Sequence, residues 1–229
     1  MQKEWRLIIS DPADAVENMA IDEAIFLLHD EGKNTKTTFR IYNWSTPCVT
    51  LGYFQKYPDE VFHKHPIVRR MTGGLTVIHG KDISYSFVTN KNDWEHVYDQ
   101  SMTYKAVHSV IKNSLETMGI STDFYEEGTK TLKKGYCVQT FFKYDLHSSG
   151  KKIVGSSQRR RNKTLLQQGS IHLDGDIDLQ SFAHSAKLCI ENFFNSKIIF
   201  SKLTDQEIKL KNELVETKYR THQWNKKFK

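Results

Sequence analysis

Two short segments combine glycines with positively charged side chains, and such a combination suits the binding of an anionic or acylated small molecule. They are RRMTGGLTVIH, residues 69–79, and GKKIVGSSQRR, residues 150–160. Adjacent glycines let the backbone close on a ligand and turn its N–H groups towards it. Arginine adds a bidentate donor for a carboxylate or phosphate, whereas lysine adds a point charge. A plain turn between strands has the same composition, so neither segment alone identifies a site.

A cysteine and a histidine near these segments could take part in covalent chemistry. Cys137 lies in a Gly-Tyr-Cys loop, with Lys134 upstream and Lys143 downstream. Positive neighbours favour the thiolate, which is the reactive form of cysteine. His79 ends the first segment and could orient a substrate or carry a proton, although a structural role is commoner for a single histidine at a strand end.

Length and cysteine content indicate one folded domain in a reducing compartment. The chain has 229 residues, 38% of them hydrophobic, and no apolar run of membrane-spanning length. Its N-terminus lacks the apolar core of a signal peptide. The cysteines are at 48, 137 and 189 and form no Cys-x-x-Cys pair, which argues against a zinc knuckle and a disulfide framework. We therefore expect a cytoplasmic protein with no membrane partner and no metal site, in which Cys48 and Cys189 belong to the core.

The charge distribution favours an acidic or anionic partner. The formal net charge is +6, and positive residues gather at Arg159–Arg161 and between Lys218 and Lys229. No helix-turn-helix, zinc-finger or RNA-binding pattern is present, so nucleic acid is not an expected partner. Arg159–Arg161 are a candidate docking site, and a merely solvated loop is an equally good explanation.

The hydrophobic spacing predicts four helices separated by clusters of strands. The helices are expected at residues 14–29, 101–118, 179–194 and 204–219. The strands are expected at residues 38–44, 49–54, 75–79, 83–89, 122–125, 144–147, 152–154 and 170–173. This order predicts an α+β fold with helices on one side of the sheet. We expect a catalytic domain over residues 1–203, followed by a charged helix and basic tail over 204–229.

Several motifs, in this order, resemble those of the biotin/lipoate protein ligase and octanoyltransferase superfamily. The similarity spans roughly residues 3–200. It rests on MAIDEA (19–24), TLGYFQ (50–55), RRMTGG with Val77 and His79, and GKKIVGSSQ (150–158). The resemblance implies a mixed, largely antiparallel sheet flanked by helices. It also implies an enzyme that attaches an octanoyl or lipoyl group to the lysine of a lipoyl-domain protein.

The position of Cys137 resembles that of the catalytic cysteine in cysteine-dependent octanoyltransferases. In that group the cysteine precedes a Tyr-[Asp/Glu]-[Leu/Ile] strand and the Gly-Lys-Lys segment, and here Cys137 precedes Tyr144-Asp145-Leu146 and Lys152. The resemblance implies that Cys137 attacks an acyl thioester while Lys152 stabilises the oxyanion. Such a transferase needs no cofactor, and acyl carrier protein is a possible donor.

The remaining site residues are expected to bind the acyl substrate. An apolar slot for the acyl chain is expected around Val77 and Tyr85. The full substrate-binding set comprises Arg70, Thr72, Gly73, Gly74, Val77, His79, Tyr85, Asp145, Gly155 and Ser156.

Two alternatives remain open at this point. The C-terminal KYRTHQWN, residues 218–225, resembles the point where lipoate ligases continue into an accessory domain. A ligase catalytic subunit would use ATP and magnesium to make an acyl-adenylate from free lipoate, with Asp145 contacting the adenylate. Leu75, Gly80 and Gln168 depart from the family pattern, which keeps a non-catalytic relative that only binds lipoyl domains as a third hypothesis.

Overall fold

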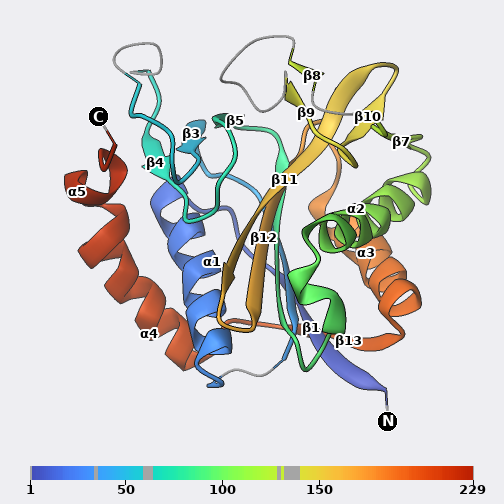
Figure 1. The fold of residues 1–229 in the computed structure, drawn as a ribbon, viewed down its shortest axis with the longest axis horizontal. Coiled ribbons are helices and arrows are strands. Elements are labelled where there is room, and N and C mark those ends of the chain that lie inside the picture. Colours follow the sequence, from blue (N-terminus) through green and yellow to red (C-terminus); the bar gives the residue numbers. More distant parts are fainter. Residues whose placement is uncertain (1, 34–35, 59–63, 128–129, 132–139, 229) are drawn as a thin grey trace.

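The protein is built around one eight-stranded mixed sheet (Figure 1). We describe it from a computed structural model, over residues 2–33, 36–58, 64–127, 130–131 and 140–228. Two neighbouring strand pairs at one edge are parallel and the other pairs are antiparallel, which confirms the predicted mixed, largely antiparallel α+β fold. In spatial order the strands are β13 (Ser196–Ser201), β1 (Lys3–Ile9), β2 (Thr38–Tyr42), β6 (Ile83–Asn90), β12 (Thr164–Ile171), β11 (Lys151–Arg161), β10 (Leu146–Ser148) and β7 (Asp123–Phe124).

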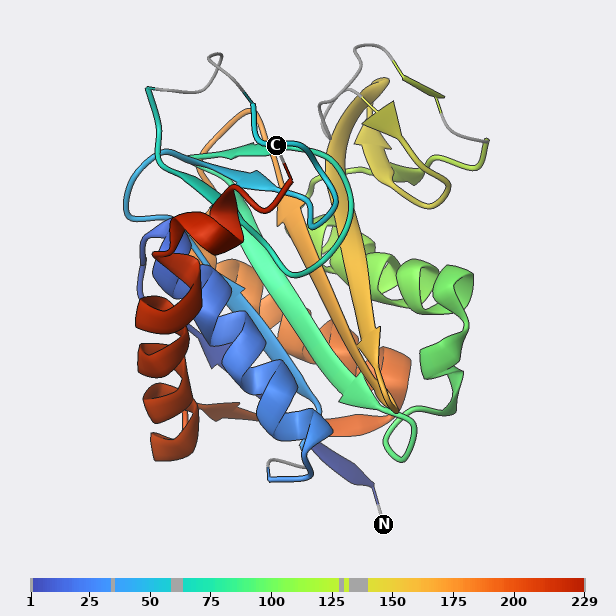
Figure 2. The same ribbon diagram turned by 60° about the vertical axis from the view of Figure 1, so that its left-hand side comes forward.

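Helices cover both faces of this sheet, so the prediction that they lie on one side was wrong. Helices α1 (Ala15–Asp30) and α4 (Asp205–Leu214) lie on one face, and α2 (Gln100–Glu116) and α3 (Leu179–Phe194) lie on the other (Figures 1 and 2). The reason is visible in β6, where alternate side chains serve different cores. Val88 packs with α1, whereas Phe87 packs in the larger core with α2 and α3. Among the described residues, no helix has both the length and the apolar character needed to cross a membrane.

A second, smaller sheet carries the first glycine segment. Its order is β4 (Ile67–Arg69), β3 (Cys48–Leu51) and β5 (Val77–His79). The turn between β4 and β5 contains the two adjacent glycines at 73 and 74. A further two-stranded pair joins β8 (Lys130–Thr131) to β9 (Thr140–Phe141).

Helix boundaries follow the capping residues in the sequence. The third predicted helix is observed at its predicted bounds, Leu179–Phe194, and Asp178 caps its first turn by accepting from the Ser181 N–H. Asp14 caps α1 in the same way. Thr204 and Glu207 form a reciprocal capping box at the start of α4. The shorter helical segments are η1 (Glu95–Tyr98), a π-helical turn at Val215–Tyr219 and α5 (His222–Asn225).

The sequence predicted only part of the long β11–β12 hairpin, and it did not predict the edge strand β13 or its neighbour β1. The predicted strands at 152–154 and 170–173 cover only one end of the hairpin. Strands β1 and β13 sit next to each other at one edge of the sheet, although nearly two hundred residues separate them in the chain. Their pairing is a long-range contact that local periodicity does not reveal.

The C-terminal segment is tied to the rest of the fold by buried polar contacts. Arg6 of β1 forms a buried ion pair with Glu207 of α4. Glu23 of α1 accepts hydrogen bonds at 2.7 Å from Lys218 and from the Tyr219 hydroxyl. We therefore propose that residues 204–228 are an integral part of the catalytic fold.

The C-terminal segment also reaches the first glycine segment through Arg69. This arginine is fully buried. Its guanidinium donates to the Gly52, Tyr53 and Gln55 carbonyls, and also to the Trp224 and Asn225 carbonyls. Such a buried cation is stabilised by carbonyl dipoles rather than by a carboxylate.

A buried ion pair between Asp22 and Arg40 joins α1 to the large sheet. Both side chains are fully buried, and Arg40 Nη1 lies 2.8 Å from Asp22 Oδ1. Asp22 also accepts from the Tyr42 and Ser86 hydroxyls and from the Gln168 side-chain amide. The carboxylate is thus shared by one helix and three strands.

Replacing Asp22 with asparagine should destabilise the fold strongly, because Arg40 would remain as an uncompensated buried charge. We expect Asp22→Asn to lower the free energy of unfolding in urea at pH 7 by about 3–5 kcal/mol. The matched control is Asp11→Asn, at an exposed position, which should change it by less than about 0.5 kcal/mol. Equal effects of the two substitutions on the free energy of unfolding would show that the buried ion pair stabilises the fold no more than an exposed carboxylate does.

Candidate active site

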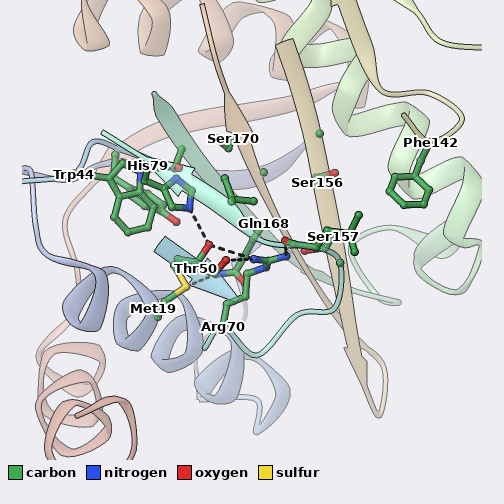
Figure 3. A pocket seen from close by; sticks show the side chains of 17 residues that line it. Met19, Trp44, Thr50, Arg70, His79, Phe142, Ser156, Ser157, Gln168 and Ser170 are labelled. Atoms are coloured by element: carbon green, nitrogen blue, oxygen red, sulfur yellow. Dashed lines mark hydrogen bonds between the residues drawn. The ribbon is translucent and has the colours of Figure 1, made fainter. Parts of the chain in front are cut away.

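An inner cavity lies between the small sheet and the β11–β12 hairpin (Figure 3). Figure 3 shows Trp44, His79 and Thr50 towards one end and Phe142 towards the other. Apolar and aromatic side chains make up one part of the wall and hydroxyl and amide groups the rest, which is usual for a cavity that binds an apolar ligand with a polar reacting group. The lining residues are Met19, Tyr42, Trp44, Thr50, Arg70, Gly74, Leu75, Val77, His79, Ser84, Phe142, Gly155, Ser156, Ser157, Gln168, Gly169 and Ser170.

Arg70 holds the glycine loop in shape while it lines the cavity. Its Nη2 donates to the Gly73 and Leu75 carbonyls at 2.8 and 2.7 Å, and its Nη1 donates to Thr50. Gly74 has φ +83°, a conformation that favours glycine. Arg70, which was predicted to contact a ligand, therefore also donates hydrogen bonds to the glycine loop itself.

Thr72 connects the glycine loop to the hairpin. Its hydroxyl donates to Gln168 at 2.8 Å and accepts from Ser157 at 3.0 Å. Gln168 in turn donates to Asp22, at 2.7 Å. Gln168, which departs from the family pattern, thus links the predicted Thr72 to the buried ion pair of α1.

His79 lines the inner cavity, and its ring stacks on that of Trp44. The two ring centroids are 4.0 Å apart. The histidine Nε2 lies 2.9 Å from the Thr50 hydroxyl, and Nδ1 lies 2.8 Å from Asp82. Burial opposes ionisation of Asp82, but His79 and the surrounding hydrogen bonds outweigh it and hold the pKa of this carboxyl below its ordinary value. Sequence reasoning missed Trp44 and Asp82, although Asp82 follows His79 by only three residues.

Lys152 ends in a buried ion pair beside the inner cavity. Its side chain is 3% exposed, and its Nζ lies 2.6 Å from Asp145 Oδ2 and 2.8 Å from the Thr140 carbonyl oxygen. Space for the ammonium exists because residue 155 is glycine. A Cβ at Gly155 would lie 2.6 Å from Lys152 Cε and 2.7 Å from Nζ. Gly155 itself lines the cavity, so the cation sits directly behind the wall.

Asp145 is fixed by three groups of this chain. Besides Lys152, it accepts from the Tyr104 hydroxyl at 2.5 Å and from the Phe142 N–H at 2.7 Å. Tyr104 in turn accepts from the Ser156 N–H at 3.0 Å. Tyr104 was not predicted from the sequence, and no local motif marks it. These contacts make Asp145 the partner of the lysine.

The structure separates the two residues predicted to line the acyl slot. Val77 lines the inner cavity, whereas Tyr85 is fully buried in the larger core and is not among the lining residues. Tyr85 lies under Gly169, where an added Cβ would come within 2.2 Å of its ring. Side chains alternate along β6, so Ser84 lines the cavity while Tyr85 lies in the larger core, behind the cavity-lining Gly169.

An outer cavity adjoins the inner one. The two share four residues, namely Gly74, Phe142, Ser156 and Ser157. The other lining residues of the outer cavity are Gly73, Gln100, Ser101, Tyr104, Lys143, Tyr144 and Gln158. Among the predicted substrate-binding residues, Gly73, Gly74 and Ser156 meet at or near this junction.

His108 lies under the junction as a buried neutral base. Its Nε2 is 2.9 Å from the Ser156 hydroxyl, and its Nδ1 is 2.7 Å from the Tyr144 carbonyl oxygen. Burial lowers the pKa of His108 to about 4. The sequence offered no signal for this role, because His108 lies within an ordinary amphipathic helix.

Cys137, the predicted nucleophile, lies outside the described residues. Cys48 and Cys189 are buried, which confirms their expected place in the core. Burial raises the pKa of the Cys48 thiol to about 12, so this thiol stays protonated.

The three consecutive arginines do not form one free cationic patch. Arg160 donates to the Val97 carbonyl and the Thr103 hydroxyl, and Arg161 lies 3.2 Å from Asp30. Arg159 lies over the Tyr53 ring, 5.2 Å from its centroid. All three predicted docking residues therefore contact other parts of the chain.

The comparisons with known proteins agree with this architecture. Residues 14–214 match the family model of the lipoyl protein ligase A/B catalytic domain, and the chain belongs to this family. Octanoyltransferase LipM of Brevibacillus brevis is 30% identical, over 97% of this chain and 99% of the relative. A lipoate-protein ligase A structure bound with ATP has a TM-score of 0.81 at 21% identity, over 97% of this chain and 98% of that one. A structure from a study of the bipartite lipoate protein ligase of Thermoplasma acidophilum and its E2 lipoyl domain has a TM-score of 0.76 at 20% identity, over 98% and 96%. These two structures establish similarity of fold.

The low pKa of His108 should make the protein lose stability in acid. Between pH 6.5 and about 4 the unfolded chain binds a proton at this position and the folded chain does not, so the free energy of unfolding falls as pH falls. The contribution is about 3 kcal/mol over the whole window. We expect the stability advantage of wild type over His108→Gln, measured by urea unfolding, to shrink from pH 7 to pH 4.5. An advantage that is independent of pH would contradict this assignment.

Proposed function

We propose that this chain is an octanoyltransferase, which moves an octanoyl group from a thioester donor to the specific lysine of a lipoyl-domain protein. The observation that carries the proposal is the Lys152–Asp145 pair, held directly behind the junction between an apolar cavity and an open one. The octanoyltransferase relative, aligned over nearly its whole length, supports the same reaction.

The first step is acyl transfer to the enzyme. The Cys137 thiol gives up its proton and the thiolate attacks the thioester carbonyl. A new carbon–sulfur bond forms, the bond to the donor sulfur breaks, and the donor leaves as a thiol that carries the proton given up by Cys137. Cys137 precedes Thr140 by three residues, and the Thr140 carbonyl accepts from Lys152. Three residues of chain span at most about 11 Å. This sequence separation supports Cys137 as the nucleophile for a carbonyl held beside Lys152.

Lys152 has the chemistry to stabilise the negative charge that develops on the carbonyl oxygen in this step. A preorganised cation in a site with little water stabilises such charge without moving. Asp145 keeps the ammonium in place, and Tyr104 keeps Asp145 in place. The backbone N–H groups of the loop at Gly73 and Gly74 are further candidate donors.

The second step transfers the acyl group to the acceptor. The acceptor amine attacks the Cys137 thioester, an amide forms and the carbon–sulfur bond breaks. The proton lost by the amine goes to the cysteine sulfur and restores the resting thiol. Both steps begin from an activated thioester, so the reaction uses no nucleotide. Acyl carrier protein is the donor that we propose.

Octanoyl transfer should proceed without ATP. Purified protein incubated with octanoyl-acyl carrier protein and a lipoyl domain is expected to give a lipoyl domain heavier by one octanoyl group, detected by intact mass spectrometry. In the absence of acceptor the enzyme itself should gain the same mass, and Cys137→Ser should abolish both products. Cys48→Ser is the control, because that thiol is buried.

The same experiment separates the alternative functions. Labelling from free octanoate or lipoate that requires ATP and magnesium, and that survives Cys137→Ser, would replace the transferase by a ligase. Tight binding of the lipoyl domain with no product under either condition would identify a non-catalytic relative.

Adding one methyl group at position 155 should displace the catalytic cation. The Cβ of Gly155→Ala would overlap the end of the Lys152 side chain, so the ammonium would have to move away from Asp145. We expect kcat to fall about 100-fold, the range seen when an oxyanion donor is lost, and the thermal midpoint to fall as well, because the buried ion pair is disturbed. Gly80→Ala is the matched control, because a Cβ there meets nothing within 4 Å. Wild-type kcat in Gly155→Ala would exclude Lys152 from a role that depends on its position.

A further inference from the structure

The outer cavity is placed to receive the leaving part of a thioester. An acyl chain in the inner cavity brings its carbonyl to the junction, behind which Lys152 lies. The sulfur side of the thioester then continues past Ser156 and Ser157, which line both cavities, into the outer one. The outer cavity thus faces the group that is attached to the donor sulfur.

The lining of the outer cavity suits a neutral chain that contains amides. Gln100 provides a side-chain amide and Ser101 a hydroxyl, and Gln158 provides its carbonyl oxygen, since its N–H groups donate to Thr103 and Gln167. Together these groups both donate and accept hydrogen bonds, as peptide-like amides require. In the described part of the lining, Lys143 is the one charged side chain.

Two lysines lie near Tyr144, Lys143 in the lining of the outer cavity and Lys105 in the lining of a neighbouring one. Lys143 Nζ is 5.1 Å and Lys105 Nζ 5.0 Å from the centroid of the Tyr144 ring. Both lysines are exposed, and neither lines the inner cavity. The neighbouring cavity, lined by Ser101, Lys105 and Tyr144 among others, extends the surface beyond the outer cavity.

Tyr144, in the lining of the outer cavity, is held in a strained conformation. Its φ is +70°, which is uncommon for a residue other than glycine. The Tyr144 N–H donates to the Tyr125 carbonyl at 2.7 Å, and the Tyr144 carbonyl oxygen lies 2.7 Å from His108. Strain of this kind persists where the surroundings hold it, and it is concentrated at functional sites.

We propose that the outer cavity binds the phosphopantetheine arm of the thioester donor, with its amides along Gln100, Ser101 and Gln158 and its phosphate between Lys105 and Lys143. This inference rests on the proposed transferase function. The support for this proposal is a match in order. Along the arm, neutral amides follow the sulfur and the phosphate comes last, and along the cavity, neutral polar side chains come before the lysines. An acyl-adenylate has the opposite order, with its phosphate bonded to the acyl carbonyl at the junction.

The test compares three octanoyl thioesters that differ only in the arm. They are octanoyl-phosphopantetheine, octanoyl-pantetheine and octanoyl-N-acetylcysteamine, each assayed with a lipoyl domain and without ATP. We expect kcat/KM to fall at each truncation, and removal of the phosphate alone should cost at least about threefold, as expected for exposed ion pairs.

Variants assign these preferences to residues. In Lys105→Gln/Lys143→Gln the ratio of kcat/KM for the phosphorylated over the unphosphorylated arm should fall to about one. Lys105→Arg/Lys143→Arg should keep most of the ratio. The control Lys91→Gln removes an exposed lysine beside Tyr98 and should keep all of it.

The outcomes distinguish this inference from the function on which it rests. If no thioester is turned over, the transferase function itself fails. If all three are turned over with equal kcat/KM, or the double glutamine variant keeps the phosphate preference, the transferase stands and the arm site is wrong. Octanoyl-coenzyme A and octanoyl-acyl carrier protein both carry the phosphopantetheine arm. A higher kcat/KM for either donor than for octanoyl-phosphopantetheine would show that its nucleotide or its protein part makes additional contacts with the enzyme.

Discussion

The buried pair of Lys152 and Asp145 is the interaction on which the site depends. An ammonium taken out of water is costly unless a partner and further hydrogen bonds compensate it. Here the partner carboxylate and the Thr140 carbonyl provide the compensation, and Tyr104 completes the carboxylate's own hydrogen bonds. Gly155 contributes by lacking a side chain. The result is a cation with a fixed position next to a cavity, where the reduced dielectric strengthens its effect on a developing negative charge.

The rest of the fold braces the two sides of the cavity and connects them. On one side the small sheet and its glycine loop are braced by Arg70 and by the buried Arg69, whose guanidinium also binds the C-terminal segment. On the other side the β11–β12 hairpin belongs to the large sheet. The chain from Asp22 through Gln168 to Thr72 connects the two sides. A polar network of this kind is favourable because its described members are mutually hydrogen-bonded.

Local features of the chain were predictable where local physics determines them. The helix at Leu179–Phe194 followed from its apolar spacing and its capping aspartate, and the burial of Cys48 and Cys189 followed from their apolar surroundings. The pairing of β1 with β13 and the placement of helices on both faces were not predictable in the same way. They depend on contacts between segments far apart in sequence. Alternation along β6 places Tyr85 in the larger core and Ser84 in the cavity lining.

The sequence by itself determined the family, the chemical types available and the order of the motifs, because residue identity and spacing are written directly in it. It also singled out Lys152, the glycine loop and His79. Only the tertiary structure decided that Asp145 is the partner of the lysine, that Tyr104 and His108 from a distant helix support the junction, and that the cavity has an inner and an outer part. Those relations exist only after a helix, a hairpin and a small sheet have packed together, since each contact joins residues that are remote along the chain.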